Sequence, residues 1–96
     1  MIYWEEQSLI DREKIFKFLY EFNPMAAEAT DETIEEKVES LLFQPNFGVE
    51  REGVNGRLLI IPNISMIVSC YFDGKNIRVM RVLHTKQKFP ETDVGD

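Results

Sequence analysis

The sequence predicts an α+β fold in the order β-α-α-β-β-β, with a helical hairpin packed on one face of a small antiparallel sheet. The first indication is a change in periodicity. Apolar residues recur at helical spacing up to about residue 43, and strand-like runs separated by turn residues follow Pro45. The second is charge. Residues 1–52 carry thirteen acidic and five basic residues, whereas residues 53–90 carry one acidic and six basic residues.

The helical half begins after a short β-prone segment at residues 2–4. Ser8 is the expected N-cap of the first helix, because Asp11 stands three residues later in the position of a capping-box acid. Asn23-Pro24 interrupts the helical pattern, since proline disfavours the helical conformation of the preceding residue and suits the first turn of a new helix. The second helix is expected to end near Phe43, before Gln44-Pro45.

The second half predicts three strands. An apolar run at Leu58–Ile61 stops at Pro62-Asn63, and Ser65–Phe72 alternates small polar with apolar residues. Asp73-Gly74 predicts a tight hairpin turn that leads into a partner strand at Ile77–Leu83. We expect residues 1–90 to form a single domain and residues 91–96 to form a solvated tail.

Length and composition exclude several classes of protein. The 96 residues contain 44% hydrophobic residues, which is typical of a globular domain. No apolar run approaches the ~20 residues of a membrane span, and the N-terminus lacks the basic region of a secretory signal. The single cysteine, Cys70, excludes an internal disulfide. We therefore expect a cytoplasmic protein without cofactor or metal, in which the helical glutamates form a solvated face.

The formal net charge of −6 argues against nucleic acid as a ligand, because phosphate binding depends on Lys and Arg. The charge is segregated, however. Residues 1–52 have a net charge of −8, and residues 53–90 have a net charge of +5, with Asp73 as the only acid. The predicted sheet is therefore compatible with an RNA or an acidic partner, although the acidic half disfavours broad, non-specific binding to nucleic acid.

Several short segments carry a family resemblance. They are residues 2–4, Asn23-Pro24 with Ala26-Ala27, Leu42 with Pro45 and Gly48, Gly56-Arg57 and, most specifically, Ile77–His84 followed by Gln87 and Pro90. Together with the order of elements, they resemble the RelE/ParE superfamily of toxins from type II toxin–antitoxin systems. The C-terminal pattern is more similar to the ParE-like branch. That resemblance implies growth inhibition by poisoning of DNA gyrase, a role in plasmid stabilisation, and neutralisation by a cognate antitoxin.

Two alternatives stay open within this superfamily. The RelE-like branch implies a ribosome-dependent mRNA endonuclease that needs no metal, but Thr85–Lys88 stands where that branch often has a catalytic tyrosine. A degenerate member would bind only its antitoxin and would not be toxic. The chain is therefore either a binding toxin, a ribonuclease or an inactive antitoxin-binding protein. A homodimer or a toxin–antitoxin hetero-oligomer is also possible from the sequence.

Candidate site residues come from the basic segment. Under the ribonuclease alternative, His84 is the candidate acid or base, and Arg57 and Arg81 are the cations that stabilise phosphate charge. In a regular strand Arg81 and His84 face opposite sides, and they converge only if the strand ends or bulges between them. Under a binding function, the antitoxin- or target-binding candidates are Arg57, Arg78, Arg81, Lys86, Lys88 and Trp4.

Overall fold

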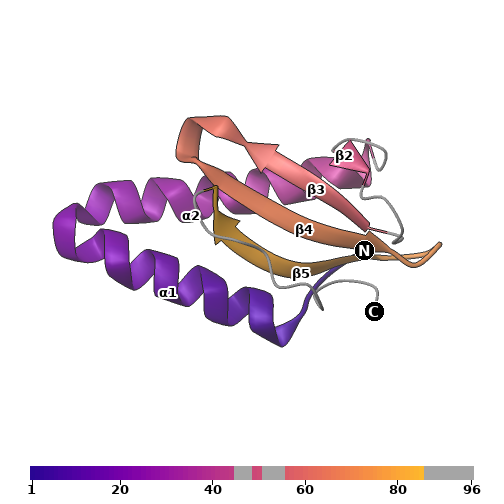
Figure 1. Cartoon of the computed structure of the whole chain (residues 1–96), viewed down its shortest axis with the longest axis horizontal. Coiled ribbons are helices and arrows are strands. Elements are labelled where there is room, and N and C mark those ends of the chain that lie inside the picture. Colours follow the sequence, from indigo (N-terminus) through magenta and orange to yellow (C-terminus); the bar gives the residue numbers. More distant parts are fainter. Residues whose placement is uncertain (45–48, 51–55, 86–96) are drawn as a thin grey trace.

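The computed structural model describes residues 1–44, 49–50 and 56–85. In chain order the elements are β1 (Ile2–Trp4), α1 (Glu6–Phe22), α2 (Pro24–Glu39), a 3₁₀ turn (Ser40–Leu42), β2 (Val49–Glu50), β3 (Gly56–Ile61), a second 3₁₀ turn (Pro62–Ile64), β4 (Met66–Phe72) and β5 (Ile77–His84). The predicted α+β class is confirmed, with the two helices behind one face of the sheet (Figure 1). Lys86, Lys88 and the predicted tail 91–96 lie outside the described residues.

The sheet has the strand order β1-β5-β4-β3-β2. The antiparallel pairing predicted for β3, β4 and β5 is confirmed, but β1 pairs with β5 in parallel. Backbone hydrogen bonds of 3.0 Å from Ile77 N–H to the Met1 carbonyl and from Glu5 N–H to the Val79 carbonyl hold this pair. No hairpin joins β1 to β5, so turn geometry does not impose an antiparallel direction on β1. The two-residue strand β2 was also not predicted.

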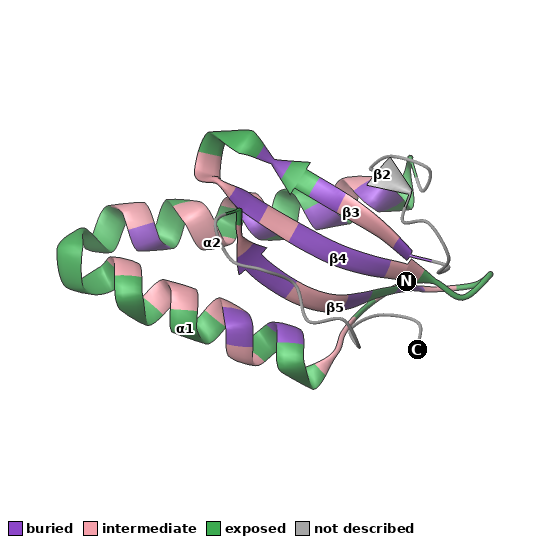
Figure 2. Cartoon of the chain, viewed as in Figure 1, coloured by how far each residue is buried: buried purple, intermediate pink, exposed green. Residues whose placement is uncertain are grey.

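The core lies between the helices and the sheet. It is built from side chains of α2, the turn after it and the helix-facing sides of β3, β4 and β5 (Figure 2). Its most completely buried members are Ile34, Val38, Leu59, Ile61, Val68, Val79 and Val82. These side chains alternate along β3 and β4 with residues that point away from the helices, so that side of the sheet is a separate surface, which we call the outer face. On it Ser69 is fully buried, whereas Leu58, Ile60, Ile67 and Tyr71 are more exposed.

The helix boundaries follow from local hydrogen bonding. The Asn23 side-chain oxygen accepts hydrogen bonds from the backbone N–H groups of Met25 and Ala26, at 3.1 and 3.2 Å, and so caps α2 as the Asn-Pro joint predicts. The predicted N-cap at Ser8 is wrong. The first helix begins at Glu6, and the buried Ser8 hydroxyl donates a 2.6 Å hydrogen bond back to the Glu5 carbonyl. A serine inside the first turn therefore mimics the expected cap.

Strand β5 contains a β-bulge at Met80. On β4, Cys70 lies opposite Val79 and Ser69 lies opposite Arg81, so that Met80 is the extra residue. The bulge shifts the alternation of β5 by one residue. Val79 and Val82 therefore both point into the core, although three positions separate them.

The turn between β4 and β5 forms as the sequence predicts. One Asp73 carboxylate oxygen accepts hydrogen bonds from the backbone N–H groups of Lys75 and Asn76, at 3.0 and 2.7 Å. Gly74 has φ of +88°, which glycine adopts without steric cost. The bonds from Asn76 and Lys75, with a smaller contribution from Arg78, lower the pKa of Asp73. The charged carboxylate therefore stabilises the turn.

Candidate binding surface

The register of the sheet assigns the predicted site residues to its two faces. Arg78 lies opposite Tyr71 and Arg81 lies opposite Ser69, so both arginines belong to the outer face. His84 lies opposite the buried Met66, on the helix-facing side. Arg57 lies opposite Cys70, whose side chain belongs to the core, and so also falls on the helix-facing side.

The bulge therefore changes which residues lie together. A regular strand would place Arg78 and Arg81 on opposite faces, whereas the bulge at Met80 brings both to the outer face. It precedes Arg81, and so Arg81 and His84 remain on opposite faces. Arg57 shares the face of His84, but the register separates their backbones by about 14 Å along the strands and about 10 Å across them. The three residues of the ribonuclease hypothesis are not brought together.

Arg81 forms an internal ion pair with Asp11 of α1. Its Nε donates to one carboxylate oxygen at 2.8 Å, and its Nη2 donates to the other at 3.2 Å. The first oxygen also accepts the backbone N–H of Val82 at 3.0 Å. Because Val82 lies beyond the end of β1, its N–H belongs to the open edge of β5. Asp11, which is 6% exposed, thus accepts the hydrogen bond of the N–H group at that edge and orients Arg81.

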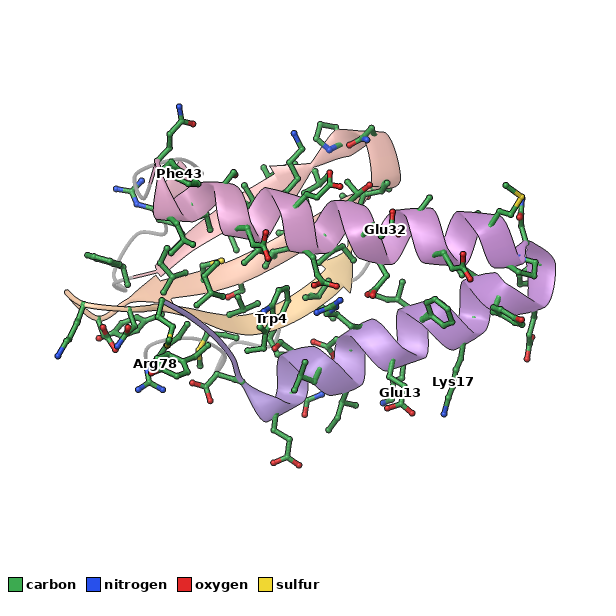
Figure 3. The ribbon with its side chains drawn as sticks, turned by 180° about the vertical axis from the view of Figure 1, so that it is seen from behind. Trp4, Glu13, Lys17, Glu32, Phe43 and Arg78 are labelled. Atoms are coloured by element: carbon green, nitrogen blue, oxygen red, sulfur yellow. The ribbon has the colours of Figure 1, made fainter. Side chains whose placement is uncertain are left out.

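Arg78 is the most accessible of the candidate arginines whose side chains the structure describes, with 44% of its side chain exposed. Its Nη1 lies 2.7 Å from a Glu5 carboxylate oxygen, and its Nε lies 3.2 Å from Asp73. The Glu5 hydrogen bond is the main reason that the pKa of Arg78 is raised, followed by Asp73. Its guanidinium carbon also lies 5.8 Å from the centre of the Tyr3 ring. Two carboxylates therefore hold Arg78 in place at the end of the sheet (Figure 3).

Trp4 is engaged inside the fold. The half-buried indole packs against the core, and the Arg12 guanidinium lies 4.4 Å from the ring centre. Arg12 also binds Asp31 through two hydrogen bonds, of 2.9 and 2.8 Å, and Glu35 through a third, of 2.9 Å. Burial alone would lower the pKa of Arg12, but the hydrogen bonds and charges of the two carboxylates raise it. This cluster joins β1, α1 and α2.

Sequence reasoning missed the structural roles of Asp11 and Arg12. Asp11 was expected to cap a helix, and nothing in the sequence pairs it with a residue 70 positions later. Arg12 gave one signal. It stands three residues after Leu9 and four before Phe16, which places a charge on an apolar helix stripe. A charge in such a position requires a partner, but the sequence does not say which one.

The outer face combines apolar and cationic side chains. Ile60 is 45% exposed, and Leu58, Ile67 and Tyr71 are half-buried around the fully buried Ser69. Among the described residues, the Ser69 hydroxyl has no hydrogen-bond partner. Among those residues, the register gives this face two arginines and no acidic residue. Both arginines are already paired with carboxylates, Arg81 with Asp11 and Arg78 with Glu5 and Asp73, so the exposed apolar side chains are the main binding feature of this face.

The described residues offer neither a cluster of metal ligands nor a helix that could span a membrane. Among the described residues, no group of three or more His, Cys, Asp or Glu side chains could hold a metal ion. Cys70 is 5% exposed, and this burial raises the pKa of its thiol to about 12. In the same part of the chain, no helix combines the length and apolar content needed to span a bilayer.

Comparison with known proteins places this fold. A solved structure of the chromosomal ParDE TA system from P. aeruginosa matches with a TM-score of 0.75 over 86% of this chain and 92% of the other, at 22% identity. The two chains therefore share a fold. A family model described as the ParE toxin of the type II toxin–antitoxin system, parDE, matches residues 2–89. The chain belongs to this ParE toxin family, as the sequence resemblance predicts. A search of curated proteins gives no match.

Proposed function

We propose that this protein is a ParE-like toxin that stops bacterial growth by binding and poisoning DNA gyrase. Family membership over residues 2–89 is the observation that carries this proposal. Membership of a toxin–antitoxin family implies a cognate antitoxin as partner. We further propose that this antitoxin neutralises the toxin. The action requires the protein to work in the cytoplasm, where gyrase and the chromosome are found.

The geometry of the candidate residues favours binding over RNA cleavage. Cleavage of RNA without a metal needs a base, an acid and cations that converge on one phosphate. Arg81 and His84 lie on opposite faces, and Arg81 is oriented by the buried Asp11. This arrangement supports a toxin that acts through its surface, and it does not favour the mRNA endonuclease alternative.

The outer face is the proposed antitoxin-binding surface. Arg78 and Arg81 share this face, and Ile60 adds exposed apolar area beside them. A segment of the antitoxin would cover the apolar side chains, and an acidic group in it would replace Glu5 or Asp73 as the partner of Arg78, while Arg81 stays paired with the buried Asp11. Arg57, Lys86 and Lys88 remain binding candidates. Trp4 is better placed to support Arg12 than to contact a partner.

Controlled expression in bacteria tests the proposed function. Expression should stop growth and induce the DNA-damage response while transcripts remain intact, and co-expression of the neighbouring antitoxin gene should restore growth. His84→Gln should remain as toxic as the parent at equal protein level. Normal growth with abundant folded protein would refute toxicity. Cleaved transcripts on expression of the parent protein, together with loss of toxicity in the His84→Gln variant, would favour the ribonuclease.

A further inference from the structure

Arg78 lies between two carboxylates that are held in different ways. One carboxylate oxygen of Asp73 accepts the backbone N–H groups of Lys75 and Asn76, at 3.0 and 2.7 Å. The other oxygen lies 3.2 Å from Arg78 Nε, so the turn between β4 and β5 fixes this contact. Among the described residues, the Glu5 carboxylate has one partner, Arg78 Nη1 at 2.7 Å. Of the two carboxylates, Glu5 is therefore the one that can leave Arg78 without disturbing the turn.

The joint between β1 and α1 does not depend on the Glu5 carboxylate. The backbone N–H of Glu5 donates to the Val79 carbonyl at 3.0 Å, which pairs the joint with β5. The Glu5 carbonyl accepts the N–H groups of Ser8 and Leu9, at 2.9 and 3.2 Å, and the Ser8 hydroxyl at 2.6 Å. These main-chain contacts hold Glu5 in place. Its side chain can therefore turn away from Arg78 while the joint stays folded.

A Glu5 carboxylate that has left Arg78 finds a favourable environment. Its side chain is 35% exposed, so that release returns the charge to water. Glu5 is also the N-cap residue of α1, and within the described part of the chain its side chain forms no capping hydrogen bond. The first N–H groups of a helix lack internal partners, and the helix dipole stabilises negative charge beside them. Release therefore exchanges one favourable position of the carboxylate for another.

Arg81, the other arginine of the outer face, does not offer this exchange. Its partner Asp11 is 6% exposed and also accepts the Val82 N–H at 3.0 Å. Displacement of Asp11 would leave a buried carboxylate and an edge N–H group without partners, which is costly. Of the two arginines that the described residues place on this face, Arg78 is therefore the one that can accept a carboxylate from outside.

We propose that Glu5 is a displaceable partner of Arg78, and that a carboxylate of the antitoxin takes its place while Asp73 keeps the guanidinium oriented. This inference rests on the proposed function and specifies which contact changes at the outer face. The Tyr3 ring, 45% exposed, lies beside Arg78 on the neighbouring strand, with its centre 5.8 Å from the guanidinium carbon. The segment that fits carries an Asp or Glu next to an apolar residue, which covers Tyr3. An anion without that apolar contact has to displace Glu5 by charge alone and binds less tightly.

The strength of the internal pair sets the size of the effect. The Arg78 side chain is 44% exposed and that of Glu5 is 35% exposed, which is typical of a weak surface ion pair. A pair of this kind leaves its cation unpaired for roughly one sixth to two fifths of the time. Apparent affinity scales with the fraction of protein in the binding-competent state. Loss of the Glu5 contact should therefore strengthen antitoxin binding by about two- to sixfold.

Competition between two forms of the folded chain for limiting antitoxin measures this change. Isotopically labelled parent and unlabelled variant are mixed with the product of the neighbouring antitoxin gene, and mass spectrometry of the complex gives the ratio of bound forms. Glu5→Gln should exceed the parent by about two- to sixfold. Glu5→Asp should also exceed it, because this variant keeps the charge but its shorter side chain withdraws from Arg78 and suits the N-cap position. The matched control Glu6→Gln, at an exposed position one residue away, should change the ratio by less than about 1.5-fold.

The same measurement tests the pairing with Arg78. Arg78→Ala should bind at least about threefold more weakly than the parent, and Glu5→Gln should give no further gain in that background. Equal capture of the Glu5 variants and the parent, an equal gain in Glu6→Gln, or parent-like binding of Arg78→Ala would overturn the exchange and leave the antitoxin as partner. Failure of the antitoxin to bind the folded parent would instead refute the proposed function, and the exchange with it. Unchanged circular dichroism of each variant excludes misfolding as the cause.

Discussion

Replacement of Asp11 by alanine tests how the structure uses its buried carboxylate. The substitution removes the acceptor of the Val82 N–H and of two Arg81 nitrogens. Removal of one partner from a buried ion pair costs about 3–5 kcal/mol, and an unsatisfied buried N–H costs about 1–3 kcal/mol. The Arg81 side chain is 20% exposed, so solvent recovers part of this cost. We expect the free energy of unfolding to fall by about 3 kcal/mol.

Urea unfolding followed by tryptophan fluorescence measures this change, because Trp4 is the only tryptophan. A loss of about 3 kcal/mol corresponds to a decrease in Tm of roughly 12–24 °C for a domain of this size. Asp11→Asn should lower the free energy of unfolding by less, since its amide oxygen can still accept a hydrogen bond from the Val82 N–H. The control Glu13→Gln breaks an exposed pair with Lys17 and should cost less than about 0.5 kcal/mol. An Asp11→Ala protein within about 1 kcal/mol of the parent would refute this account of the edge.

Three further predictions concern the interior. Arg12→Lys keeps the charge but loses the bidentate pairing with Asp31. It should lower the free energy of unfolding, measured in urea, by about 1–3 kcal/mol, and an unchanged free energy would contradict the role of this pairing. Because the pKa of Cys70 is raised in the folded state, its neutral thiol contributes stability that is fully present below about pH 9. The free energy of unfolding should then fall by up to ~1.4 kcal/mol per pH unit between about pH 9 and 12. The Cys70→Ala variant should lack this decrease. Identical plots of unfolding free energy against pH for the parent and the variant would contradict the prediction. Deletion of Met80 removes the extra residue and joins Val79 directly to Arg81, so that a regular strand keeps Arg81 on the outer face and Val82 in the core. The deletion should therefore keep a cooperative unfolding transition, and loss of that transition would contradict the assigned register.

The sequence predicts most of the local structure of this fold. Asn23-Pro24 separates the helices because the asparagine caps one helix and the proline suits its first turn. Asp73-Gly74 forms its turn for equally local reasons. Periodicity and turn residues are properties of short segments, and so they can be recognised without knowledge of distant contacts.

The candidate site depends on contacts between distant segments, and the sequence predicted it less well. Residues 79–83 are mostly apolar and do not alternate, so the sequence gives no sign that Met80 is bulged. That bulge determines which face Arg81 occupies. The pairing of Arg81 with Asp11 joins the first helix to the last strand, and only the folded structure places these two residues together. The sequence therefore identified the basic residues but not their arrangement.

Supercoiling by purified DNA gyrase, in the presence of the folded chain, is the most direct test of the proposed toxin function. The account predicts that the chain inhibits supercoiling and causes cleaved DNA to accumulate, and that addition of the cognate antitoxin reverses both effects. Arg78→Glu, at an exposed position of the outer face, should reduce this reversal by the antitoxin. Unchanged gyrase activity, with the same preparation cleaving mRNA on ribosomes, would contradict the account.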